Sequence, residues 1–372
     1  MSSHHIRNSN IELLRIISML LITLHHFSLW GRGGYADTLI NNRQTVQAFQ
    51  TLIFLPIGDI GVYCFAMITG FYLAGKSVSS SKSFKKIGKI YLQMYFYCMI
   101  FLILGLHFHL PLNNYPNAID PLMPFNRIPN ILMSLMPITF KHYWFVTDFI
   151  LLMLFVPYIN RCLNGLEQKK FLKLLIIMIV STGIFPLLNN NIVSETVGLG
   201  ILMTSYMIGF YIKQFLVVKR YKLPIGLSLL IVNTAIIYAV TFYDIVFLKY
   251  RYIRIYTGIF ALLAAMGLFL IFISLKPNYN ILIDSVAKHM FAVYLVTENI
   301  FVIKPLWKLF SFENIQNLTK VNFYGFVSVV GIMLVICAID AIREQIFNVI
   351  YKTARVGFKI FAKLELSNKQ SI

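Results

Sequence analysis

Two residues that can do chemistry lie inside the first apolar segment of the chain. Arg15 is followed by ten residues and then His26, with His25 directly before it. In an α-helix this spacing places Arg15 and His26 within about 20° of each other around the axis and roughly 16 Å apart along it, whereas His25 is rotated by about 80°. A guanidinium suits phosphate or carboxylate recognition, and a histidine suits general-base work. Arg15 and His26 therefore lie on one face of the helix. This arrangement predicts a ligand with an anionic part near Arg15 and a reacting group near His26.

A simpler interpretation of this segment stays open. Glu12 lies one turn before Arg15, so the two side chains can form an ion pair with a purely structural role. Ionisable residues inside apolar helices are nevertheless costly, and they usually face a bundle interior or a water-filled cavity.

The composition shows what must position these residues. Of the 372 residues 58% are hydrophobic and 13% are charged, about half the charge of an average soluble domain. A single soluble core stops growing near ~250–300 residues and cannot hide so much apolar surface. The sequence therefore predicts an integral membrane protein and excludes a soluble enzyme or a nucleic-acid module.

A membrane-spanning helix needs roughly 20 apolar residues. Ten segments qualify, and the fold class predicted is an all-α polytopic membrane protein with about ten transmembrane helices in one bundle. The region 111–142 can hold a further short or re-entrant helix. The ten segments are 10–30, 52–75, 90–110, 143–160, 171–188, 196–215, 223–243, 255–274, 287–307 and 321–341.

The distribution of charge predicts the orientation. With both termini on one side, 22 Lys and Arg residues fall on that side and 10 on the other. Cytoplasmic loops collect Lys and Arg, so both termini are expected in the cytoplasm. The net charge of +19 is explained in the same way and requires no nucleic-acid partner. We expect two parts, a transmembrane domain over 1–342 and a basic cytoplasmic tail over 343–372 that lies along the inner leaflet.

Several motifs together resemble the acyltransferase family 3 membrane proteins. Glu12-Leu-Leu-Arg15 with His26 is similar to the opening motif of that family. The segments 58–71, 142–145, 157–160 and 290–295 resemble later family motifs, and they occur in the same order. We expect no appended hydrolase-like domain.

The resemblance implies transfer of an acyl group, most often acetyl, from cytoplasmic acyl-CoA to a hydroxyl of an extracytoplasmic glycan at the plasma membrane. It implies that His26 and Arg15 are the catalytic residues and that acyl-CoA is a substrate rather than a bound cofactor. We expect no metal site. The family tends to carry Arg-x-x-Arg after its second helix, where this chain has Lys85, Lys86 and Lys89. Lysines bind phosphate as point charges without the bidentate fork of arginine, and they are also expected in a solvated cytoplasmic loop.

Three further residues are candidates for binding the acceptor. Asp148 and Glu298 are carboxylates within apolar segments, and either can orient a histidine or bind sugar hydroxyls. Trp144 can form a sugar platform or belong to the aromatic belt at the membrane interface. A transporter or flippase remains the alternative function, because carriers also bind substrates near the midplane. We see no matching Gly- or Pro-interrupted helices to support it.

The charge count generates a labelling prediction. Single cysteines introduced at Asn42 and Asn114, in loops expected outside, should react with a membrane-impermeant thiol reagent added to intact cells. A cysteine at Ser80, among the basic residues expected inside, should react only after permeabilisation. Labelling of Ser80 in intact cells would overturn the predicted topology.

Overall fold

The computed structural model describes residues 8–110, 130–188, 198–216, 222–248, 258–312, 315 and 317–369, and no strand occurs among them. Its first half contains α1 (Ser9–His26), the π-helix η1 (Phe27–Gly31), α2 (Arg32–Asn41), α3 (Thr45–Thr51), the 3₁₀-helix η2 (Leu55–Ile57), α4 (Gly58–Leu73), α5 (Ser80–His107), α6 (Asn130–Leu135), α7 (Trp144–Asn164) and α8 (Gln168–Ile179). The second half contains η3 (Val180–Ile184), α9 (Phe185–Leu188), α11 (Leu199–Phe215), α12 (Lys222–Tyr243), η4 (Asp244–Leu248), α13 (Ile259–Ser274), α14 (Ile281–Lys288), α15 (Met290–Thr297), α16 (Ile303–Leu309) and α17 (Leu318–Lys369).

These helices confirm an all-α polytopic membrane protein. Among the described residues, 7 helical segments are long and apolar enough to cross a bilayer. The shorter apolar helices α11 and α13 pack beside them, and both are largely buried inside the bundle. Most of the region 111–142 lies outside the described residues, and the short α6 is the part of it with a described helix. The predicted count of ten crossings is not confirmed.

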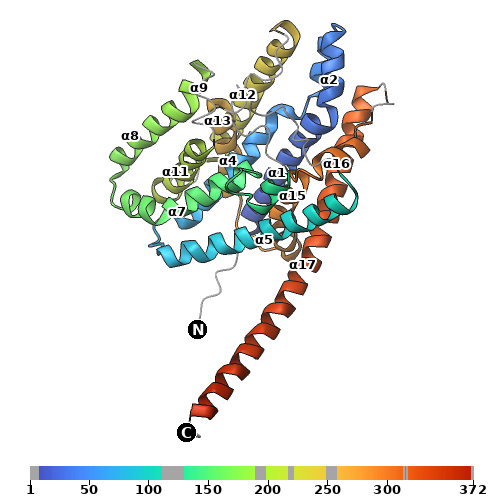
Figure 1. The fold of residues 1–372 in the computed structure, drawn as a ribbon. Helices are drawn as coiled ribbons and strands as arrows, with labels where there is room; N and C mark the ends of the chain where they lie inside the picture. The colour runs from blue at the N-terminus through green and yellow to red at the C-terminus, as the bar shows by residue number, and fades with distance from the viewer. Residues whose placement is uncertain are drawn as a thin grey trace.

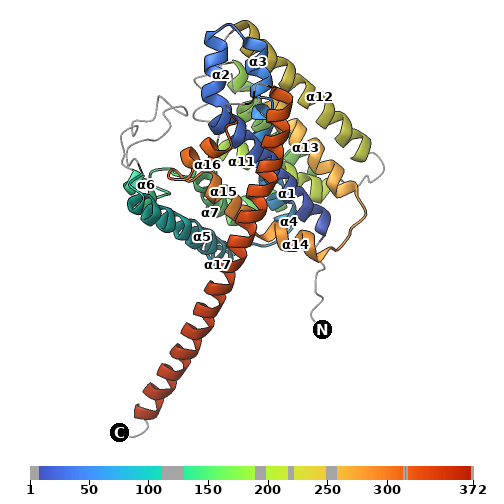
Figure 2. The ribbon, with the colours of Figure 1, turned by 90° about the vertical axis from the view of Figure 1, so that its right-hand side faces the viewer.

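The segment that carries His26 is longer than a bilayer is thick. Asn8 caps its start by accepting a hydrogen bond from the backbone N–H of Asn10, and α1, η1 and α2 follow one another without a gap. These 33 residues form a rod roughly 50 Å long at 1.5 Å per residue. In both views α2 lies at the end of the bundle opposite to the C-terminal part of α17 (Figures 1 and 2). His26 therefore lies near the middle of this rod.

The ninth predicted segment, 287–307, is not one continuous helix. The structure divides this part of the chain into α14, α15 and α16. Asn280 caps α14, and His289 separates it from α15. After Thr297 the backbone leaves the helix until Ile303. The pattern of apolar residues predicted one membrane-spanning helix here, and the structure instead has helix ends at the polar residues His289 and Glu298.

The last helix passes the predicted domain boundary without a break. α17 has 52 residues, which corresponds to roughly 78 Å, and residues 342 and 343 lie well inside it. Its C-terminal half projects away from the bundle in both views (Figures 1 and 2). Whether this half lies along the inner leaflet stays a prediction.

Glycines allow α4 to pack closely against its neighbours. A Cβ at Gly61 would overlap with the carbonyl oxygen of Ser18 in α1. A Cβ at Gly70 would overlap with the carbonyl of Tyr206 in α11, and one at Gly209 of α11 with the carbonyl of Met67. Small residues at such crossings let helix backbones approach directly, which is a common way of packing helices inside membranes.

This packing predicts opposite effects of one substitution at two glycines. Gly70→Ala should lower the melting temperature in detergent, because its methyl group has no space against the α11 backbone. Gly88→Ala in α5 meets nothing within 4 Å and should leave stability unchanged or raise it, because alanine favours helices over glycine by about 0.5–1 kcal/mol. Size-exclusion chromatography after heating measures both, and equal melting temperatures would contradict the close α4–α11 contact.

Candidate active site

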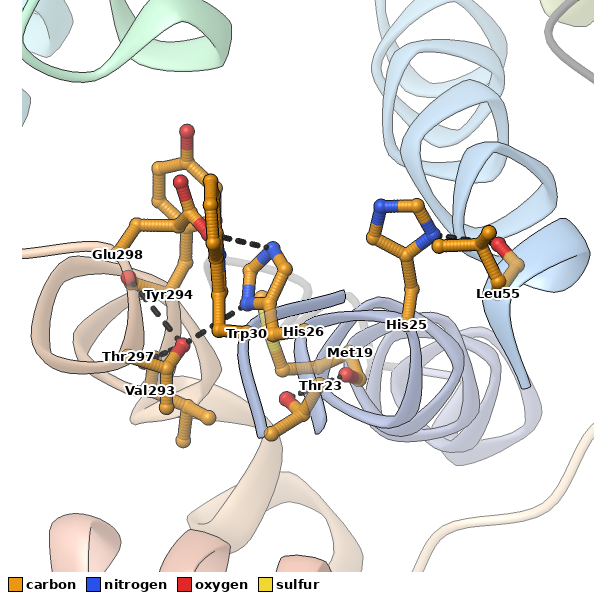
Figure 3. Close-up of polar contacts among 10 residues, drawn as sticks. All are labelled: Met19, Thr23, His25, His26, Trp30, Leu55, Val293, Tyr294, Thr297 and Glu298. Carbon is orange, nitrogen blue, oxygen red and sulfur yellow. Dashed lines mark hydrogen bonds and ion pairs between the residues drawn. The ribbon is translucent and has the colours of Figure 1, made fainter. Parts of the chain in front are cut away.

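His26 lies at the end of α1 in a buried polar cluster (Figure 3). Its Nε2 is 3.0 Å from Oε1 of Glu298. Nε1 of Trp30, one turn further along in η1, donates to the same oxygen at 3.0 Å. His26 is 6% exposed. A carboxylate in such a place requires donors, and α1 and η1 supply two of them.

The second ring nitrogen of His26 also has a partner. Nδ1 is 3.3 Å from Oγ1 of Thr297, and the Thr297 hydroxyl donates to the carbonyl of Val293 at 2.9 Å. With a hydrogen on both ring nitrogens, Nε2 donates to Glu298, Nδ1 donates to Thr297, and each hydrogen has an acceptor. The cluster is thus complementary to an imidazolium, which is the form that a histidine takes after it accepts a proton.

The turn that carries Glu298 is held by side chains from the start of α7. Tyr143 donates to the carbonyl of Leu295 at 3.0 Å, and Asn299 donates through Nδ2 to the Tyr143 hydroxyl at 2.7 Å. The backbone N–H of Ile300 points to Nε2 of His142 at 3.3 Å. These bonds satisfy backbone groups freed by the end of α15, so the turn is fixed without being helical.

His25 faces the other way (Figure 3). Its Nδ1 donates to the carbonyl of Leu55 in η2, which leaves the acceptor lone pair of the neutral ring on Nε2. The ring packs where a Cβ at Gly58 would be, so glycine is required there. His25 therefore joins α1 to the start of α4, as the rotation between neighbouring helix positions predicts.

Arg15 forms an ion pair with Glu12, and its side chain remains partly exposed. Its Nη1 is 3.0 Å from Oε2 of Glu12, and the Arg15 side chain is 30% exposed. The guanidinium also lies 6.0 Å from the ring of Tyr72. The positive charge of Lys86 is close enough to interact with that of Arg15. Two cations from α1 and α5 thus gather at one place, and the single carboxylate of Glu12 does not neutralise both.

A row of aromatic rings connects these cations with His26. The ammonium of Lys86 lies 5.7 Å from the ring centre of Phe149. Phe149 is 5.8 Å from Phe145, Phe145 is 5.6 Å from Tyr294, and Tyr294 is 6.3 Å from His26, measured between ring centroids. The aromatic row therefore extends from Lys86, near Arg15, to the polar cluster around His26.

The other predicted residues lie elsewhere. Lys85 and Lys89 are exposed on α5. Trp144 packs edge-on against Phe145. Asp148 is 3.8 Å from Lys141, and Gly198 packs against its carboxylate. The structure therefore brings Glu298 to His26 but does not bring Trp144 or Asp148 into contact with that pair.

A second buried cluster was missed by sequence reasoning. Asp340 in α17 accepts hydrogen bonds from Nδ1 of His289 at 2.7 Å, Nε of Arg343 at 2.6 Å and the hydroxyl of Tyr97 at 2.8 Å. The available signal was a carboxylate within the apolar segment 321–341, the same kind of signal that singled out Glu298. Among the described residues, no group of three His, Cys, Asp or Glu side chains is placed to hold a metal ion.

The helices and the largely enclosed histidine–carboxylate pair define the class of the protein, which is a polytopic helical membrane protein with a polar cluster inside its bundle. The family is then shown by comparison: a family model described as an acyltransferase domain matches residues 8–339, nearly the whole chain. The chain belongs to this family and is a membrane acyltransferase. No curated protein and no solved structure matches it.

Proposed function

We propose that the protein transfers an acyl group, acetyl in the first instance, from cytoplasmic acyl-CoA to a hydroxyl of a cell-surface or exported polysaccharide. The observation that carries this proposal is the aromatic row with Arg15 and Lys86 at one end and the His26–Glu298 pair at the other. An activated thioester with polyanionic phosphates matches this arrangement, because its charged and reacting ends lie far apart. The protein acts in the plasma membrane with both termini in the cytoplasm.

His26 is the general base in the proposed reaction. It takes the proton of the acceptor hydroxyl at Nδ1, where that hydroxyl replaces the contact with Thr297, while the oxygen attacks the thioester carbonyl, so that a C–O bond forms. The C–S bond then breaks, and the CoA sulfur leaves with the electron pair and takes the proton from His26. Glu298 holds the ring through Nε2 and stabilises its charge between the two proton transfers.

The remaining candidates bind the two substrates. Arg15 and the α5 lysines Lys85, Lys86 and Lys89 attract the phosphates of CoA. Trp144 and Asp148, in the first two turns of α7, bind the acceptor chain beyond the reacting hydroxyl, since neither touches the His26–Glu298 pair.

A carrier without acyl-transfer chemistry is the second candidate. The interruptions between α14, α15 and α16 favour it, because discontinuous helices often mark transport sites. Purified protein in nanodiscs separates the two functions. An acyltransferase releases CoA from acetyl-CoA when a polysaccharide acceptor is supplied, and NMR of surface polysaccharide detects the acyl group in cells that contain the protein. A carrier does neither.

The geometry predicts different outcomes for the two adjacent histidines. His26→Ala should lower acyl transfer by about 10²–10⁴-fold, the usual contribution of a general base, while CoA binding survives. Glu298→Gln should lower kcat by a smaller factor, since the ring loses its charged partner but keeps Thr297. Release of CoA from acetyl-CoA measures the rates.

The matched control is His25→Asn, whose side-chain amide can still donate to the Leu55 carbonyl. It should keep most of the activity, and His25→Ala should lose stability rather than chemistry. Full activity of His26→Ala would remove the general base from the mechanism.

The cationic end predicts the behaviour of the donor. Lys86→Glu should raise KM for acetyl-CoA, because a repulsive charge replaces an attractive one near Arg15, and the difference from wild type should shrink in high salt. Lys89→Glu should act in the same direction. Lys173→Glu on α8, an exposed residue with the same change of charge, is the control. Equal KM values in all variants would leave the α5 lysines as topology determinants.

A further inference from the structure

A pocket of about 450 Å³ opens between the α4–α5 loop and the end of α7. Its ten lining residues contain two cations, Lys76 and Arg161, and no carboxylate. Three serines of the loop and the aromatic ring of Tyr158 complete much of the wall. The size is in the usual range of sites for small organic ligands. The pocket is separate from the His26 cluster.

The pocket has a fixed wall. Asn160 is 1% exposed, and its Nδ2 donates to the carbonyls of Leu73 at 2.9 Å and Lys76 at 3.3 Å. Its Oδ1 accepts from the hydroxyl of Tyr206 in α11. One buried amide thus holds the end of α4 and its loop against α7. The loop that presents Lys76 is therefore held in place by a hydrogen-bond network in the bundle interior.

The charges of this pocket are not neutralised by the protein. Lys76 and Arg161 are both exposed, and in the described part of the chain neither has a carboxylate within ion-pair distance. A guanidinium binds phosphate through two parallel hydrogen bonds, and an ammonium binds it as a point charge. Serine hydroxyls add further donors. Two cations without a carboxylate select an anion, and the neighbouring tyrosine ring suits a flat base.

The rise along α7 gives the distance from this pocket toward the His26 cluster. Pro157 lines the pocket, Phe149 lies under Lys86, and Phe145 contacts Tyr294 beside His26. At 1.5 Å per residue, Pro157 lies roughly 12 Å from Phe149 and roughly 18 Å from Phe145 along the helix. The arm of CoA between the diphosphate and the sulfur has about twelve bonds. Extended, it spans roughly 14 Å, which is the length of four extended peptide residues with the same number of backbone bonds. Measured along α7 as far as Phe145, the pocket thus lies at the distance of the nucleotide, one diphosphate beyond that arm.

We propose that this pocket binds the phosphate-bearing nucleotide of the acyl donor, with Arg161 and Lys76 on its phosphates and Tyr158 against its base. This inference rests on the proposed function, since it assumes that the donor is a CoA thioester. The phosphate of an anionic lipid headgroup has the same chemistry, and the experiment separates the two sources.

The test compares two donors that differ in the nucleotide. Arg161→Gln and Lys76→Gln should each raise KM for acetyl-CoA roughly tenfold, the lower range expected for a lost hydrogen bond to a charged group, with kcat unchanged. KM for acetyl-pantetheine, which lacks the nucleotide, should not change. Equilibrium binding of CoA to the same variants should weaken by the same factor, and Lys173→Gln on α8 is the matched control.

Each other outcome has a defined meaning. If wild-type protein neither binds CoA nor uses acetyl-CoA, the proposed function itself fails. If wild type uses acetyl-CoA and both variants keep its KM, or if both donors are affected equally, the pocket proposal alone fails. A heat-stability gain from anionic lipid in nanodiscs that Arg161→Gln abolishes, with KM for acetyl-CoA unchanged, would assign the pocket to a lipid headgroup instead.

Discussion

A carboxylate that is largely enclosed in a membrane bundle persists only where donors compensate its charge. Glu298, with a side chain 11% exposed, is such a carboxylate, and the rest of the site depends on it. Nε2 of His26 and Nε1 of Trp30 meet it, both at 3.0 Å. Those donors come from α1 and η1, whereas Glu298 follows α15 near the other end of the chain. Removal of either donor would leave a buried charge with less compensation, so the pairing determines where α15 lies against α1.

The interruption of the helix after Thr297 is what makes this pairing possible. Neighbouring residues in an α-helix point about 100° apart and do not face one another. Because the helix ends there, Thr297 and Glu298 can contact the two nitrogens of a single imidazole. Non-helical backbone at membrane depth is tolerated when protein groups satisfy it, and Tyr143 and Asn299 do so. The cost of the break is thereby offset at the place where the polar cluster is needed.

The sequence predicts the parts of this arrangement that depend on local periodicity and on the cost of charge in lipid. Those two rules predict the all-α membrane class and the position of Arg15 and His26 on one helix face. They also identify Glu298 as a candidate site residue. The same rules single out Asp148, which instead lies beside Lys141. Nothing local distinguishes the two carboxylates, because their partners come from segments far away in the chain. The break at Thr297 is hidden for the same reason, since the segment is apolar on both sides of it.

The two buried clusters together explain how so short a helix as α15 can carry part of a site. Its eight residues cover roughly 12 Å, far less than a bilayer. His289 at its start is tied to Asp340 of α17, and Glu298 at its end is tied to His26 of α1. Hydrogen bonds are directional, so two at opposite ends fix both the position and the rotation of the helix. Because Asp340 also accepts from Tyr97, the same cluster ties α5, the helix of the basic residues, to the turn that holds the imidazole.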